Sequence, residues 1–229
     1  MSIFGTGTSK LAFPSFLVFG AMSVVAADLS KYRDLQFGAS LSTVARQAGM
    51  NPSEAKVIHS RPVLLQELTW RPQPVGSSTH TEPAEEVVFR FYNSELFQVE
   101  INYDRHETEG LTPDDLVDAI SATYGTCTKP AAPLKTATPA FGEQEELQAE
   151  WQDPQYRFYL VRSSYGPNFK LVGVMKRLEE PVQTAKREAA RLDAEEAPQK
   201  EANRIARQNE VERIRLEQAR LVNKRKFRP

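Results

Sequence analysis

The chain has 229 residues, a formal net charge of −1 at pH 7 and a single cysteine, Cys127. This length allows one or two small hydrophobic cores, and the lone cysteine excludes an internal disulfide as a source of stability. The near-neutral total hides a division along the chain. Residues 178–229 carry 13 Lys or Arg against 10 Asp or Glu, whereas residues 28–177 carry a net charge of −5. A tail of mixed sign is weak support for any particular anionic partner.

The first 27 residues have the pattern of an export leader. Lys10 supplies a positive charge, residues 11–26 are almost wholly apolar or small, and Val25 and Ala27 occupy the small-residue positions before a cleavage site. The apolar run is shorter than the ~20 residues that cross a bilayer. We predict a signal peptide over 1–27, cleaved near Ala27, and a periplasmic or secreted protein with no nucleic-acid partner and no stable membrane insertion. An uncleaved N-terminal anchor is the alternative.

A helix followed by three strands is predicted in the first unit, residues 28–110. Ser40 can cap a helix that Gly49 ends, and its apolar positions recur at helical spacing: Leu41, Val44, Ala45 and Ala48. Alternation of apolar and polar residues then predicts strands over 64–70, 87–93 and 96–104. The last two strands are joined by a short, turn-prone link, which predicts a hairpin.

The same order returns in the second unit, residues 111–178. Thr112 caps a helix that begins at Pro113 and closes at Gly125, with a buried stripe predicted at Leu116, Ala119, Ile120 and Thr123. A linker rich in Pro, Ala and Thr follows from Lys129 to Gly142. Three strands are predicted after it, over 146–152, 156–164 and 170–178. The predicted fold class is therefore α+β, with two related units of one helix and a three-stranded antiparallel sheet each.

The composition changes abruptly at Glu179 and predicts a charged helical tail over 179–229. Its first part has apolar residues at a four-three spacing suited to packing on a partner: Leu178, Val182, Ala185, Ala189 and Leu192. Pro198 should interrupt that helix. A second, solvated helix is predicted from about Lys200 to Val222, with a disordered end after it.

One stretch of the first unit resembles a known family. "FGASLSTVARQAG" (37–49), Trp70 and "VVFRFYNSELFQVEI" (87–101) are similar to the SmpA/OmlA-like module, over about residues 34–104. The resemblance implies helices packed on a three-stranded antiparallel sheet, as in an accessory lipoprotein of the outer-membrane β-barrel assembly machinery and, in tandem, in the β-lactamase-inhibitor-protein fold. It also implies an exported module that binds another protein or envelope material. The lipid-bearing cysteine of the assembly lipoprotein is missing here.

Four side chains are the candidate binding residues. If the strand phenylalanines and tryptophans face the helices, then the opposite face carries Arg90, Tyr92, Arg157 and Tyr159. Arg and Tyr are enriched at binding hot spots, because each combines a large contact area with hydrogen-bonding capacity. The alternative is cross-strand pairing of the arginines with Glu67, Glu100 and Glu150.

No catalytic motif, metal-ligand spacing or cofactor motif is present, so we predict a non-enzymatic protein-binding module of the bacterial cell envelope, with no metal and no cofactor. Two alternatives stay open. Residues 103–115 gather Asp104, His106, Glu107, Glu109, Asp114 and Asp115, which would suit an envelope hydrolase or a metal-dependent enzyme. The C-terminal helix could instead make this a structural protein that oligomerises.

Overall fold

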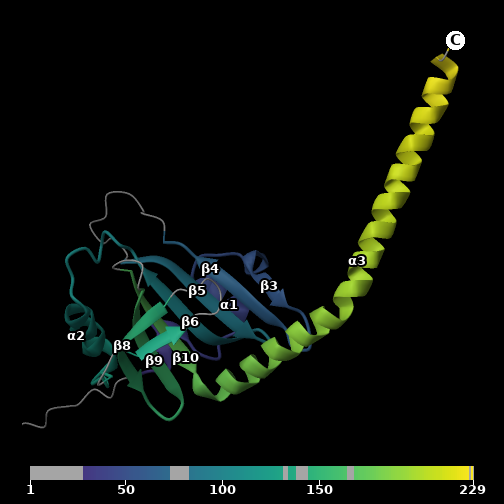
Figure 1. Ribbon diagram of the computed structural model, residues 1–229. Helices are drawn as coiled ribbons and strands as arrows, with labels where there is room; N and C mark the ends of the chain where they lie inside the picture. The colour runs from purple at the N-terminus through teal and green to yellow at the C-terminus, as the bar shows by residue number, and fades with distance from the viewer. Residues whose placement is uncertain are drawn as a thin grey trace, which may run out of the picture.

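The computed structural model describes residues 28–72, 83–130, 134–137, 144–163, 168–226 and 228. The predicted leader, 1–27, lies outside the described residues. In the part that is described, one large antiparallel sheet and a two-stranded ribbon combine with two short helices and the long helix α3 (Lys176–Lys226), which leaves the body of the protein (Figure 1). The predicted α+β class is confirmed.

Eight strands form the large sheet, in the order β3-β4-β5-β6-β10-β9-β8-β7. Their bounds are β3 Lys56–His59, β4 Leu65–Trp70, β5 Ala84–Tyr92, β6 Glu95–Tyr103, β7 Leu134–Ala137, β8 Gln144–Gln152, β9 Tyr156–Ser163 and β10 Phe169–Met175. The predicted hairpin is β5–β6. At the centre of the sheet β6 pairs with β10, with Leu171 opposite Ile101. Strands from both predicted units therefore share one sheet and one core, and the division into two related units stays a prediction.

Several short elements are not predicted by the sequence pattern. They are the ribbon strands β1 (Lys31–Tyr32) and β2 (Leu35–Gln36), the 3-10 turn η1 (Pro52–Glu54), β3 and β7. Runs of two to four residues are too short to show a hydrophobic period. The strand β7 lies inside the segment expected to be a linker, so that expectation was wrong at 134–137.

The two short helices begin where their caps predict. In α1 (Leu41–Gln47) the backbone N–H of Thr43 donates to the Ser40 hydroxyl, and in α2 (Pro113–Tyr124) Thr112 and Asp115 form a reciprocal capping box. The buried side of α2 is made by Leu116, Val117, Ile120 and Tyr124. The predicted stripe was therefore wrong at Ala119 and Thr123, because the helix turns its Val117 and Tyr124 side toward the sheet.

One face of the sheet is apolar and is covered by α1 and α2. Its fully buried side chains include Phe89, Val99, Ile101, Trp151, Phe158 and Leu160. They form one cluster with Val44 and Ala45 of α1 and with Ile120 of α2. The indole N–H of Trp151 donates to the Ser121 hydroxyl and to the Gly125 carbonyl, at 3.1 Å each, and so joins β8 to α2.

The C-terminal region departs from expectation in two ways. Residues 176–178 were expected to end a strand but begin α3, and one helix of 51 residues replaces the expected two. Pro198 lies inside this helix and does not end it. Proline removes one helical hydrogen bond and favours a kink, and α3 bends along its course (Figure 1).

The four-three spacing at the start of α3 serves packing within the chain itself. Leu178, Val182, Ala185 and Ala189 are buried, and Leu178 and Val182 belong to the hydrophobic core. Arg177 pairs with Glu95 and Arg61 pairs with Glu196, which fixes the helix beside the sheet. From 197 to 226 every residue is exposed. The first part of the predicted tail thus belongs to the folded body.

Removing residues 199–229 should leave the body intact. The deleted helix buries no side chain, so the free energy of unfolding should change by less than about 0.5 kcal/mol, while the helical circular-dichroism signal falls. Urea denaturation of the full and truncated chains checks this. A loss of several kcal/mol would show that the distal helix packs on the body.

Candidate functional site

The second face of the sheet carries the polar side chains that alternate with the core residues. Glu67 of β4 is opposite Arg90 of β5, and Tyr159 of β9 is opposite Val172 of β10. Neither α1 nor α2 covers this face. The start of α3 crosses one end of it, where Val182 lies near Phe97 and Val174. The remainder of the face is open.

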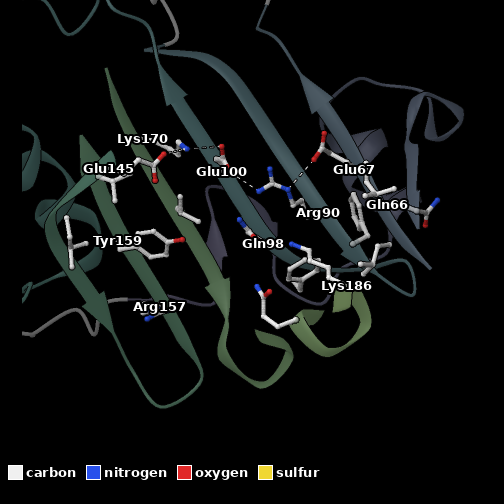
Figure 2. A pocket seen from close by; sticks show the side chains of 18 of the residues that line it. Gln66, Glu67, Arg90, Gln98, Glu100, Glu145, Arg157, Tyr159, Lys170 and Lys186 are labelled. Atoms are coloured by element: carbon white, nitrogen blue, oxygen red, sulfur yellow. Dashed lines mark hydrogen bonds and ion pairs between the residues drawn. The ribbon is translucent and has the colours of Figure 1, made fainter. Parts of the chain in front are cut away.

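A hollow of about 730 Å³ lies between this open face and α3. Its walls combine ion-paired side chains with aliphatic ones from the same strands, including Leu147, Val161 and Val172. From α3, Gln183 and Lys186 complete the lining. Figure 2 shows Arg90, Gln98 and Tyr159 pointing into this space from the sheet and Lys186 reaching into it from the side of α3.

A chain of alternating charges crosses the floor of the hollow. Arg90 Nε lies 3.1 Å from Glu67 Oε2, and Arg90 Nη1 lies 2.7 Å from Glu100 Oε2. Glu100 also faces Lys170 at 3.3 Å, and Lys170 reaches Glu145 at 2.5 Å. The chain joins β4, β5, β6, β10 and β8, and none of its five side chains is more than 27% exposed. Such a network holds the floor of the hollow in one arrangement.

The ion pairs outweigh the cost of burying these charges. Burial alone would raise the pKa of Glu100, but the positive charges of Arg90 and Lys170 reverse the shift and lower it. Burial would likewise lower the pKa of Arg90, and the carboxylates of Glu100 and Glu67 raise it instead. The central pair is therefore charged at neutral pH.

Glu100→Gln should destabilise the protein in a pH-dependent way. The substitution leaves Arg90 and Lys170 partly uncompensated, which should cost about 2 kcal/mol at pH 7. The folded pKa of Glu100 is lowered, so its contribution is complete above the ordinary value of 4.5 and is lost as the pH falls through the lowered pKa. The difference in the free energy of unfolding between parent and variant, measured by urea denaturation, should therefore become smaller at acid pH. Glu107→Gln, at an exposed turn, is the control. If both variants lost the same free energy of unfolding relative to the parent, the role of Glu100 would be contradicted.

The hollow brings together three of the four candidate binding residues. Arg90, Arg157 and Tyr159 line it, whereas Tyr92 lies in a separate groove against Pro181 and Ala185 of α3. Both arginines are engaged in the pairing that was the alternative interpretation. Arg90 contacts Glu67 and Glu100, and Arg157 contacts Glu150 at 3.8 Å and Glu179 on α3. The role of the two arginines in binding stays a prediction.

Other lining residues were not foreseen from the sequence. Gln98 occupies an ordinary polar position of a strand, and Gln183 and Lys186 lie in a segment expected to be separate from the body. Only the packing of Val182 and Ala185 against the sheet carries Gln183 and Lys186 to the hollow. The four-three spacing predicted that this helix packs on another surface, but it did not identify that surface.

The His106 region contains a polar turn. The Asp104 carboxylate accepts hydrogen bonds from the backbone N–H groups of His106 and Glu107, and Asp115 is engaged in the cap of α2. Within the described ranges, no group of three or more His, Cys, Asp or Glu side chains is placed to hold a metal ion. Cys127 is partly buried beside the core.

In the described part of the chain, no helix has the length and apolar character needed to span a membrane. No protein-family model, curated protein or solved structure matches this chain.

Proposed function

We propose that this protein is an exported, non-enzymatic protein-binding module of the bacterial cell envelope. The leader pattern of residues 1–27 supports export. The resemblance to the SmpA/OmlA-like module is part of the same proposal and rests on the sequence motifs alone. The partner binds to the open polar face of the sheet, in the hollow beside α3.

The observation that carries this proposal is the hollow itself. Aliphatic side chains lie between the paired charges of its floor. Binding surfaces commonly combine a rigid apolar centre with polar groups that fix the orientation of the ligand. Tyr159 and Arg157 are of the residue types enriched at hot spots. The Arg157 guanidinium lies over the Tyr159 ring at 5.4 Å from its centroid, an arrangement that holds both side chains in place.

A bulky side chain in the hollow should abolish partner binding. Gln98 lines the hollow and is not part of the chain of ion pairs. Gln98→Trp should therefore fill the hollow and leave the ion pairs intact. Gln47→Trp is the matched control, because Gln47 is exposed on α1, which covers the opposite face. Both variants and the parent would be used for crosslinking capture from an envelope extract of the natural source.

Capture by the parent and by Gln47→Trp, but not by Gln98→Trp, supports the proposal. Equal capture by all three proteins would contradict it. The comparison avoids Arg157, because reversing its charge would place a third carboxylate beside Glu150 and Glu179 and would loosen α3.

A second candidate function is oligomerisation through the distal part of α3. Val211, Ile214 and Leu221 are 67%, 44% and 52% exposed, and positions separated by three and seven residues lie along one side of a helix. If this side associates, the mass in solution should depend on concentration for the full chain and not for a chain lacking 199–229. Sedimentation equilibrium of both chains tests it, and a full chain that stays monomeric at every concentration rules it out.

A further inference from the structure

The hollow contains several hydrogen-bond donors for which the described residues supply no acceptor. Within the described residues, the buried Nε–H of Arg157 has no hydrogen-bond partner. The Tyr159 hydroxyl, the Lys186 ammonium and the side-chain amides of Gln98 and Gln183 also line the hollow, and no hydrogen bond or ion pair to another described residue holds them. Gln98, Tyr159 and Gln183 meet again at the adjoining recess under α3, so they lie close together.

Lys186 differs from the other cations of this face. Arg90, Lys170 and Arg157 each contact two carboxylates, whereas Lys186 has Arg90 as a charged neighbour. Partial burial lowers the pKa of Lys186, and the positive charge of Arg90 lowers it further against a smaller opposing effect of Glu67. The Lys186 side chain is exposed to solvent on the side of the hollow, and an anion bound there would offset the positive charge of Arg90.

We infer that the hollow binds one carboxylate carried on an aliphatic chain, held by Lys186, Tyr159 and the neighbouring amides. The donors define the anionic end of this ligand. Leu147, Val161 and Val172 form the apolar walls that its hydrocarbon part would contact. The four glutamates of the lining, Glu67, Glu100, Glu145 and Glu150, would repel a doubly charged group such as phosphate more strongly than a single carboxylate.

This inference rests on the proposed function, because a protein partner can supply such a group in two ways. An acidic side chain between aliphatic residues is one source, and the C-terminal carboxylate of a chain that ends in an aliphatic residue is the other. Both present a single carboxylate beside apolar surface. The two sources can be separated with short peptides.

Three peptides test the inference by isothermal titration with the purified protein at fixed ionic strength: acetyl-Leu-Glu-Leu-amide, acetyl-Leu-Leu with a free C-terminus, and the neutral control acetyl-Leu-Gln-Leu-amide. At least one of the two carboxylate peptides should bind about tenfold more tightly than the glutamine peptide, since a charge-assisted hydrogen bond of this kind is worth about that factor. Whichever of the two binds more tightly identifies the source.

Variants then locate the bound carboxylate. Lys186→Met keeps an unbranched side chain and removes the charge, and should weaken binding of the preferred peptide about tenfold or more. Tyr159→Phe should weaken it to a smaller extent. Arg207→Met, which removes one positive charge from the exposed part of α3, should have no effect. Far-ultraviolet circular dichroism and melting curves confirm that each variant folds.

Two results would overturn the inference. The first is that neither carboxylate peptide binds more tightly than the glutamine peptide, which includes the case in which no peptide binds. The second is that Lys186→Met binds the preferred peptide as tightly as the parent does. Either result concerns the chemistry of the ligand alone. The proposed function would still be judged by capture with Gln98→Trp and Gln47→Trp, so the two failures are distinguishable.

Discussion

Replacing Gly173 with valine is expected to lower the free energy of unfolding by about 3 kcal/mol. Gly173 of β10 is opposite Phe158 of β9, and a Cβ at this position would lie less than 3.0 Å from three atoms of the Phe158 ring. The ring is fully buried. It stacks on Tyr124 with 4.3 Å between centroids and meets Phe37 edge-on at 5.9 Å, so it has no space to move aside.

A double-mutant cycle separates this clash from a general intolerance of β10 to substitution. Phe158→Ala alone should cost about 3–5 kcal/mol. In that background Gly173→Val should cost far less than in the parent, because the ring that it meets is gone. Urea denaturation gives all four values. Costs that add without coupling would contradict the packing described between Gly173 and Phe158.

Trp151→Ala is expected to have an effect of similar or greater size, about 4 kcal/mol. Trp151 is fully buried in β8, and its indole N–H reaches both Ser121 and Gly125 at the C-terminal end of α2. The substitution removes a large apolar contact and leaves the Gly125 carbonyl without this donor. Thermal or urea denaturation measures the loss.

Two milder substitutions divide the contribution of Trp151. Trp151→Phe keeps much of the apolar contact and removes the donor, so it should cost about 1–3 kcal/mol. Ser121→Ala should cost about 1 kcal/mol or less, because the indole can still donate to Gly125. If Trp151→Phe were as damaging as Trp151→Ala, the hydrogen bonds would account for nearly all of the effect, contrary to this description.

Alternation along the central strands predicted the sheet well, because burial on one face imposes a period of two on the sequence. Phe89 does face the core, and Arg90 faces the other side. The strand prediction was wrong at the end of β10, where Lys176, Arg177 and Leu178 are helical. At this boundary the four-three helical spacing that starts at Leu178 decides the structure, because its apolar residues pack as a helix.

Pro198 shows a second limit of sequence reasoning. Proline disfavours a helix interior by removing one hydrogen bond and by steric conflict with the preceding turn. The surrounding residues are rich in Ala, Glu, Lys, Arg and Gln, all of which have high helix propensity. In this sequence the helix propensity of the flanking residues outweighs the cost of the proline, and α3 continues through Pro198. Many i,i+3 and i,i+4 ion pairs lie on its surface, such as Arg204 with Glu201.

The candidate site could be predicted only in part. The sequence indicated which strand residues share the polar face, and it named Glu67, Glu100 and Glu150 as possible partners for the arginines. It could not give the pairing of β6 with β10, which brings Lys170 to Glu100. Nor could it place Lys186 over the hollow, because that position depends on where the apolar stripe of α3 packs.

The central claim is that the partner contacts the hollow beside α3, and site-specific photocrosslinking in the natural source tests it most directly. A benzophenone amino acid would replace Gln183, at the hollow, or Gln47, on α1, in otherwise identical full-length chains. A discrete crosslinked protein obtained from position 183 and not from position 47 is the predicted result. The same crosslinked protein from position 47 alone, or from both positions equally, would contradict the claim.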